Sequence, residues 1–416
     1  MKENFEINSN AIDKIKKITS EEKIFRIKNL ELFKSAGFPN KRQEDWKFSD
    51  FQNIINSNFD ELNTENVSYS IKKINLLKHF NHNYVFLVNG NLHSSNFDYE
   101  DKNKIKISSY DKSFEKEIST NPLVCLNNAL ADNGFSLEIE ENYKFKKVLI
   151  VYNFFTKNLK NKILNNKNKL KLNKNSELHV IEYTINESKS KFINNSYEDI
   201  FLEENSKLKN LHMQSNKSDG FFHKFLKSKL CSNSNYSNFI FSSGLKFNKL
   251  DIECNLIGEN ANCNILSGLF LKKNEHQEIK TRINHLSPNC KSYQKVKNVL
   301  NEESKGIFQG KIYVQDVAQR TDAYQLSKAL LLNDNAEFNS KPELEIYADD
   351  VKCIHGSTSG SIDENSIHYL MTRGLTKKEA IQLLINGFLH EIVSEIKSPA
   401  IRKFVENKIE LQIHGY

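Results

Sequence analysis

The sequence lacks several features that would place it in a familiar class. It contains no run of about 18 apolar residues, so no helical membrane span is expected. The first ten residues, MKENFEINSN, are polar and acidic, unlike a secretion signal. No Cys-x-x-Cys spacing of a zinc ribbon occurs, and the cysteines stand singly at Cys125, Cys231, Cys254, Cys263, Cys290 and Cys353. These absences predict a protein of the reducing cytoplasm, without disulfides or a membrane partner.

Common catalytic and nucleotide-binding motifs are also absent. There is no G-x-x-x-x-G-K-[ST], G-x-S-x-G or H-E-x-x-H, so the chain is expected to bind no nucleotide and to have no catalytic site. Asp349 and Asp350 would point to opposite faces of a strand. One alternative stays open: a stand-alone carbohydrate-active β-helix enzyme, if the fold stacked Asp322 near Asp349.

The apolar share of 38% is low, although 28 Phe and 15 Tyr support a folded core. A solenoid suits this composition, because each repeat packs mainly on its neighbours and needs only a thin core. Opposite charges are interspersed, and the net charge is +7. The most basic stretch, 156–175, lacks aromatic residues for base stacking after Phe155, so it is interpreted as solvated surface and no nucleic-acid partner is predicted.

The residue pattern divides the chain into three regions. Apolar residues at helical spacing before Gly37 and Pro39 predict an N-terminal helical region over 1–80. Short β-branched and aromatic runs, separated by Asn, Ser and Gly, predict a β core over 81–360. Amphipathic patterns return in a C-terminal helical domain over 361–416.

A weak repeat within the β region suggests its architecture. The pattern apolar-x-x-Asn-[Ser/Ala]-x-apolar starts at Leu172, Leu202, Ile257 and Leu332, so that successive starts lie 30, 55 and 75 residues apart. These gaps are roughly one, two and three times a period of about 25–30 residues, as in a β-solenoid. Asparagine tolerates the left-handed backbone that solenoid corners need. A β-sandwich remains the alternative from this pattern alone.

The C-terminal region carries a clear helix pattern. Thr376 and Glu379 have the spacing of a capping box, and Ser398-Pro399 marks the start of a further helix. Between them runs an apolar stripe that includes Ile381, Leu384, Ile385, Phe388 and Ile392. Such helices can cap the end of a solenoid or dock a partner, and the pattern does not decide between these roles.

The segment VKCIHGSTSG, residues 351–360, contains the most chemically suggestive pair. On a strand, Cys353 and His355 would share one face, and a thiolate with an imidazole can bind iron or zinc. Two ligands do not complete a tetrahedral site, so others would have to come from elsewhere in the fold or from a partner. A buried cysteine beside a hydrogen-bonded histidine, or a nucleophilic Cys-His pair, remains open.

Residues 310–380 resemble the SufB/SufD family, the scaffold subunits of the SUF system for iron–sulfur cluster assembly. The resemblance is carried by DAYQ, LLLNDNAEFNSKPELEIYADDVKC, HG and YLMTRG, and it extends over about 290–396. The segment GFPNKRQEDWKFSD, 37–50, is similar to the Arg-x-Glu-x-Trp-Lys segment typical of the SufD branch. The SufB-type main scaffold is the alternative within the family.

This resemblance implies a right-handed parallel β-helix with helical domains at both ends, and a non-catalytic scaffold role. It implies a heterodimer with a SufB-like scaffold through the β-helix and docking of a SufC-like ABC ATPase on the C-terminal stripe. His355, with Cys353 beside it, would face the SufB-like partner and share a transient iron–sulfur cluster with it. The family commonly has Ser where this chain has Ile354, which would point away from the pair.

Overall fold

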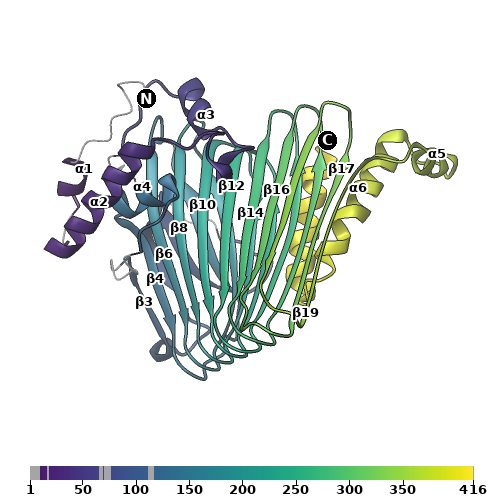
Figure 1. Ribbon diagram of the computed structural model, residues 1–416. Helices are drawn as coiled ribbons and strands as arrows, with labels where there is room; N and C mark the ends of the chain where they lie inside the picture. The colour runs from purple at the N-terminus through teal and green to yellow at the C-terminus, as the bar shows by residue number, and fades with distance from the viewer. Residues whose placement is uncertain (1–9, 16–17, 65–68, 70–75, 111–116, 416) are drawn as a thin grey trace.

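The computed structural model describes residues 10–15, 18–64, 69, 76–110 and 117–415. Two sheets enclose a shared interior, and successive strands from β4 onward alternate between them (Figure 1). The ten-strand sheet contains, in chain order, β1 Asn83–Val88, β2 Asn91–Asn96, β5 Leu149–Phe155, β7 Glu177–Asn186, β9 Lys207–Gln214, β11 Asn235–Ser242, β13 Asn262–Leu271, β15 Lys291–Leu300, β17 Thr321–Leu331 and β19 Val351–Ser361. The nine-strand sheet contains β3 Ile105–Ser109, β4 Asn133–Ile139, β6 Ile163–Leu172, β8 Ile193–Leu202, β10 Ser218–Leu230, β12 Leu245–Leu256, β14 His276–His285, β16 Lys305–Val314 and β18 Glu337–Ile346.

Within each sheet, neighbouring strands from β4 and β5 onward pair in parallel. Each coil of the chain therefore contributes one strand to each sheet, and the predicted parallel β-helix is confirmed. Only β1 with β2 and β3 with β4 pair antiparallel among the named strands. The β-sandwich alternative is wrong, because a sandwich of hairpins would be antiparallel throughout.

Asparagines form one corner of the solenoid, where the chain passes from the nine-strand to the ten-strand sheet. Asn175, Asn205 and Asn260 have φ of 57° to 58°, in the left-handed region. The backbone N–H of Asn175 donates to Glu204 O in the next coil at 3.0 Å, so each corner is bonded to the following one. The interpretation of the repeat is confirmed for these three units.

The fourth predicted unit is wrong. Asn335 lies between β17 and β18, at the opposite corner, and it is not among the described residues with positive φ. Conversely, Asn233 and Asn289 occupy the asparagine corner with φ of 57° and 60°, and the repeat pattern missed them. Their flanking residues differ from the pattern, since only the left-handed backbone is required at this position.

Helices cover the outer faces of both sheets (Figure 1). The N-terminal layer packs around Trp46, Phe51 and Phe247 on the nine-strand sheet and consists of α1 Asn10–Asp13, α2 Ser20–Ala36, the 3-10 turn Glu44–Trp46, α3 Phe51–Asn58 and α4 Pro122–Leu130. The C-terminal helices are α5 Glu364–Thr372, α6 Lys377–Val393 and α7 Pro399–His414. Of these, α6 and α7 bury their apolar side chains on the ten-strand sheet.

Local helix signals in the sequence are confirmed. Helix α2 ends before Gly37, whose φ of 71° suits glycine, and α7 starts at Pro399. Thr376 Oγ1 accepts from the N–H of Glu379 at 3.3 Å, and the Glu379 carboxylate accepts from the N–H of Thr376 at 2.8 Å, which completes the capping box. Among the helices in the described ranges, none is long and apolar enough to cross a membrane.

Candidate functional site

The segment with Cys353 and His355 forms the last strand of its sheet. β19 pairs with β17 on one side, and no other described strand lies on its free side. β18 is likewise the last strand of the nine-strand sheet. The end of the solenoid farthest from α1 and α2 therefore presents two open strand edges (Figure 1). Open edges expose unpaired N–H and C=O groups, which favour pairing with another chain.

Cys353 and His355 lie on the same face of β19, as predicted. Their Cα partners on β17 are Ala323 and Gln325, whose side chains are buried. Cys353 is half-buried and packs against the apolar cluster around Ile312, whereas His355 is exposed. Burial, with a further contribution from Asp322, raises the pKa of the Cys353 thiol. A protonated thiol is a poor metal ligand, so His355 is the more available donor of the pair.

Exposed apolar side chains accompany this pair at the open end. Ile354 points to the other face of β19 and is 59% exposed, and Tyr347 is 60% exposed.

Asp322 lies opposite Lys352 in the neighbouring strand, not opposite Asp349. The carboxylate pair that the glycan-enzyme alternative required is therefore not brought together.

The predicted docking stripe on α6 divides into two groups. Ile385 and Ile392 are fully buried against this chain's own ten-strand sheet, and a side chain built at Gly268 would lie 2.7 Å from Ile392. Ile381, Leu384 and Phe388 are half-buried. Leu383, on the opposite face, is 51% exposed. A partner could therefore reach α6 through its exposed face, while Ile385 and Ile392 hold the helix on the sheet.

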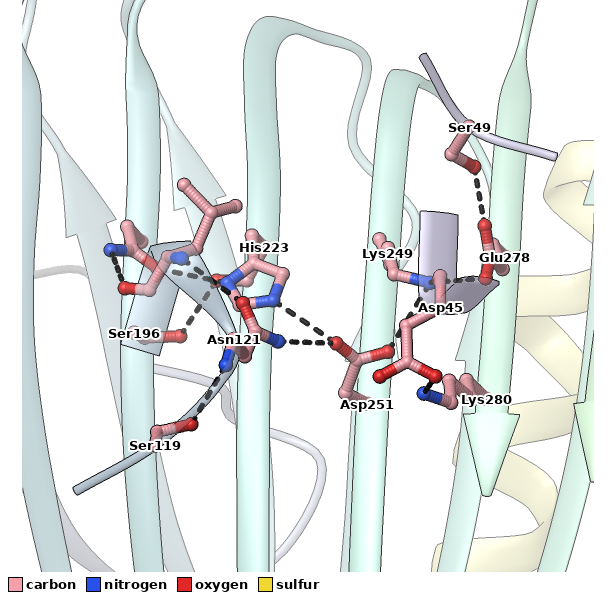
Figure 2. A network of polar contacts seen from close by, with 12 residues as sticks. Asp45, Ser49, Ser119, Asn121, Ser196, His223, Lys249, Asp251, Glu278 and Lys280 are labelled. Carbon is pink, nitrogen blue, oxygen red and sulfur yellow. Dashed lines mark hydrogen bonds and ion pairs between the residues drawn. The ribbon is translucent and has the colours of Figure 1, made fainter. Parts of the chain in front are cut away.

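A buried polar row on the outer face of the nine-strand sheet was not predicted (Figure 2). His223 on β10, Lys249 on β12 and Glu278 on β14 are aligned in register on three neighbouring strands. Asp251 contacts both of the first two, with its carboxylate 3.3 Å from His223 Nε2 and 3.3 Å from Lys249 Nζ. Each of these four residues is at most 4% exposed, so their charges are neutralised almost entirely by groups within the protein.

This buried polar row anchors residues 37–50, the segment that resembles the SufD branch in sequence. Lys249 Nζ donates to Asp45 O at 3.1 Å and lies 4.7 Å from the centre of the Trp46 ring. Ser49 donates to the Glu278 carboxylate (Figure 2). Burial opposes the charged form of Asp251, but Lys249 and His223 hold its pKa below the usual range. The network therefore fastens the N-terminal helices to the sheet, and only Trp46 and its neighbours were visible as a signal in the sequence.

A second unpredicted cluster lies in the interior. Glu182, Glu198 and His212 have ligand atoms within 4.8 Å of one another, and Lys224 forms ion pairs with both carboxylates. The sequence offers no signal for this group, because its members come from four separate strands.

Comparisons with known proteins agree with the fold. The family described as "SUF system FeS cluster assembly, SufBD core domain" matches residues 154–388. The iron–sulfur cluster assembly protein SufD of Escherichia coli (strain K12) is 36% identical over 160 residues, which cover 38% of each chain. A SufBD family protein of Synechocystis is 30% identical over 205 residues, 49% of this chain and 45% of that protein.

A third relative, the chloroplastic protein ABCI7 of Arabidopsis thaliana, is 25% identical over 236 residues, 56% of this chain and 50% of its own length. The alignments thus span half or less of the length of these relatives. The family match covers more than half of the present chain and includes the β-helix from β6 to β19. This protein belongs to the SufBD family of the SUF system for iron–sulfur cluster assembly.

Proposed function

We propose that this chain is a SufD-type scaffold subunit that pairs with a SufB-type chain and builds an iron–sulfur cluster between the two. The observation that carries the proposal is the open edge of β18 and β19, which bears His355 and Cys353 in a member of the SufBD family. The 36% identity to a protein named SufD favours this branch over the SufB type.

The open edge supports a protein partner by its polarity and its shape. A strand from a second solenoid could satisfy the free backbone groups of β19, and the exposed Ile354 and Tyr347 would lose water on contact. His355 supplies one soft-to-borderline donor at this edge, and iron–sulfur clusters need several. The remaining ligands would come from the partner, so that the cluster forms only in the complex and is cargo rather than a resident cofactor.

The C-terminal helices are proposed to dock a SufC-type ATPase, which would supply the nucleotide chemistry. α5 extends away from the sheets (Figure 1), with Tyr369 57% and Met371 42% exposed. Together with Leu383 on α6, these side chains expose apolar surface that a partner could cover. The chain itself would be a non-catalytic scaffold of the cytoplasm.

The test uses the complete complex. Wild type, His355→Ala and the control His93→Ala, an exposed histidine on β2 at the other end of the ten-strand sheet, are each co-expressed with SufB-type and SufC-type chains and purified without oxygen. Visible absorbance and iron content per complex are then measured. We expect all three complexes to assemble and only His355→Ala to lose the cluster. Equal iron and absorbance in wild type and His355→Ala would contradict the role of His355.

A further inference from the structure

The interior cluster lies at a place where four strands face one another. Glu182 on β7 and His212 on β9 belong to the ten-strand sheet, whereas Glu198 on β8 and Lys224 on β10 belong to the nine-strand sheet. Residues two or four positions away on the same strands, such as Val180 and Leu226, are in the interior apolar core, so these four side chains also point inward. The cluster therefore spans the space between the sheets.

The contacts within the cluster are those of a compact ion-binding group. His212 Nδ1 lies 3.1 Å from Glu182 Oε1. Lys224 Nζ is 2.7 Å from Glu182 Oε2 and also contacts the Glu198 carboxylate. The Lys224 ammonium thus holds the positive charge between two carboxylates. Nδ1 of His212 faces the Glu182 carboxylate and Nε2 faces the Asn210 amide, so an ion would bind the tautomer that has its electron pair on Nδ1.

Asn210 provides an independent indication of a ligand. It is 2% exposed, its Nδ2 lies 3.2 Å from His212 Nε2 and donates to Glu182 Oε1 at 3.4 Å, and its Oδ1 has no hydrogen-bond partner among the described residues. Turning the amide over would let Oδ1 accept from Nε2–H of His212, which would free Nδ1 to coordinate an ion. Metal-binding histidines usually donate their second ring N–H in this way to a neighbouring acceptor.

The cluster also has room beside it. Glu182, His212 and Lys224 line a partly open cavity of about 110 Å³, together with polar side chains such as Thr184 and Gln214. A cavity of this size and polarity holds several water molecules, which could complete a coordination shell. It also leaves space for the Lys224 ammonium to swing aside.

We propose that Glu182, Glu198 and His212 bind one divalent first-row transition metal ion, and that Lys224 is the cation that occupies the site in its absence. One imidazole and two carboxylates suit Mn²⁺, Fe²⁺ or Zn²⁺ better than Mg²⁺, which prefers an all-oxygen shell with several waters. The two carboxylates balance the charge of the ion. The site lies inside this chain, apart from the β19 edge, and does not rest on the proposed function.

The test measures binding of Mn²⁺ to the isolated full chain after treatment with a chelator, in buffer with excess Mg²⁺. Isothermal titration and the Mn²⁺ electron paramagnetic resonance signal give stoichiometry and affinity. We expect one Mn²⁺ per wild-type chain, and a loss of affinity of about 10- to 100-fold or more in Glu182→Gln and His212→Gln. Lys224→Met removes the competing ammonium and is expected to bind Mn²⁺ more tightly than wild type. Glu177→Gln, on the same strand but outside the cluster, should bind like wild type.

Two outcomes would overturn the proposal: wild type and Lys224→Met both bind no stoichiometric Mn²⁺, or Glu182→Gln binds as tightly as wild type. Circular dichroism and melting check that each variant folds. If Glu182→Gln does not fold, Glu182→Gln with Lys224→Met replaces it, since that change removes one negative and one positive charge together. This double variant must then bind more weakly than Lys224→Met alone.

Discussion

Asparagine at the solenoid corner combines two properties in one side chain. Asn205 has a left-handed φ of 58°, which most residues adopt only at a cost of about 1–2 kcal/mol. Its amide Nδ2 also donates to Asn175 Oδ1 in the preceding coil at 3.1 Å, so the corner is bonded along the solenoid axis. Glycine could adopt the same left-handed backbone, but it has no amide for the bond between coils. An apolar side chain would provide neither the backbone conformation at low cost nor the hydrogen bond.

Exchanging Asn205 tests the two properties separately. Asn205→Ala loses the amide bond and introduces left-handed strain, so we expect a loss of about 1–2 kcal/mol in the free energy of unfolding. Asn205→Gly keeps the backbone conformation and should lose less. Urea denaturation of the three chains gives the comparison. Equal stability of the alanine and glycine variants would show that the left-handed backbone does not limit this corner.

A buried histidine makes stability depend on pH. His285, at the end of β14, is fully buried and bonded to Ser292 Oγ at 2.9 Å, and burial lowers its pKa to about 4 from a usual value of about 6.5. Above about pH 6.5 it is neutral in both states. As the pH falls from 6.5 to 4, the unfolded chain takes up a proton that the folded chain excludes, which removes about 1.4 kcal/mol per pH unit.

His285→Gln should remove this part of the pH dependence. We expect the wild type to be the more stable at pH 7.5 and its advantage to shrink as the pH is lowered to 5. Thermal or urea unfolding at matched pH values measures the difference between the two chains, so that the effects of other titrating groups cancel. An advantage that stays constant over this range would contradict a neutral, buried His285.

At the scale of the element, a mixed polar and aromatic contact adds to the apolar packing of α6 on the sheet. Lys297 on β15 donates to Phe388 O at 2.7 Å, lies 4.3 Å from the centre of the Phe388 ring and contacts the Glu391 carboxylate. Hydrogen bonds from Lys295 and Lys297 to the Glu391 carboxylate lower the pKa of Glu391 to about 2. The Phe388 ring therefore shields a cation that is itself nearly buried.

Phe388 and Leu383 lie on different faces of α6, so we expect their substitution to have different effects on stability and on partner binding. Phe388→Ala removes the ring over Lys297 and should destabilise the chain by about 1–2 kcal/mol, less than the 3–5 kcal/mol of a fully buried phenylalanine. Leu383→Ala should leave the melting temperature unchanged and weaken co-purification with a SufC-type ATPase. If Leu383→Ala retains full co-purification, the exposed face of α6 is not the docking surface.

At the scale of the whole molecule, a buried ionic network joins the N-terminal layer to the solenoid. Lys249 is the centre of this network, since it contacts Asp251, Glu278 and the backbone of Asp45. Removing it would leave two buried carboxylates without their main counter-ion. Partial removal of a buried ion pair is far more damaging than loss of an exposed one.

Lys249→Met is therefore expected to lower the free energy of unfolding by about 3–5 kcal/mol. The control Lys280→Met breaks the more exposed ion pair with Asp45 and should lower it by about 0–1 kcal/mol. Fluorescence of Trp46, the single tryptophan, follows the release of the N-terminal segment during denaturation. Similar losses in both variants would contradict a central role for Lys249.

Local features of this chain were readable from the order of its residues. The stop at Gly37, the capping box at Thr376 and the left-handed backbone at Asn175, Asn205 and Asn260 depend on interactions within a few residues, so they were predicted correctly. The shared face of Cys353 and His355 follows from the alternation of any strand. The family also followed from residues 310–380, because its motifs are contiguous.

Contacts between coils depended on the tertiary structure. Glu182 and His212 are 30 residues apart and Glu198 and Lys224 are 26 apart, so one fixed period would not align both pairs. Corner lengths differ from coil to coil, and a shift of one residue turns a side chain to the other face. The same variation placed the pattern at Leu332 in the wrong corner. The composition and local order therefore specified a solenoid and its ends, but only the stacking of its coils decided which distant charges share the interior.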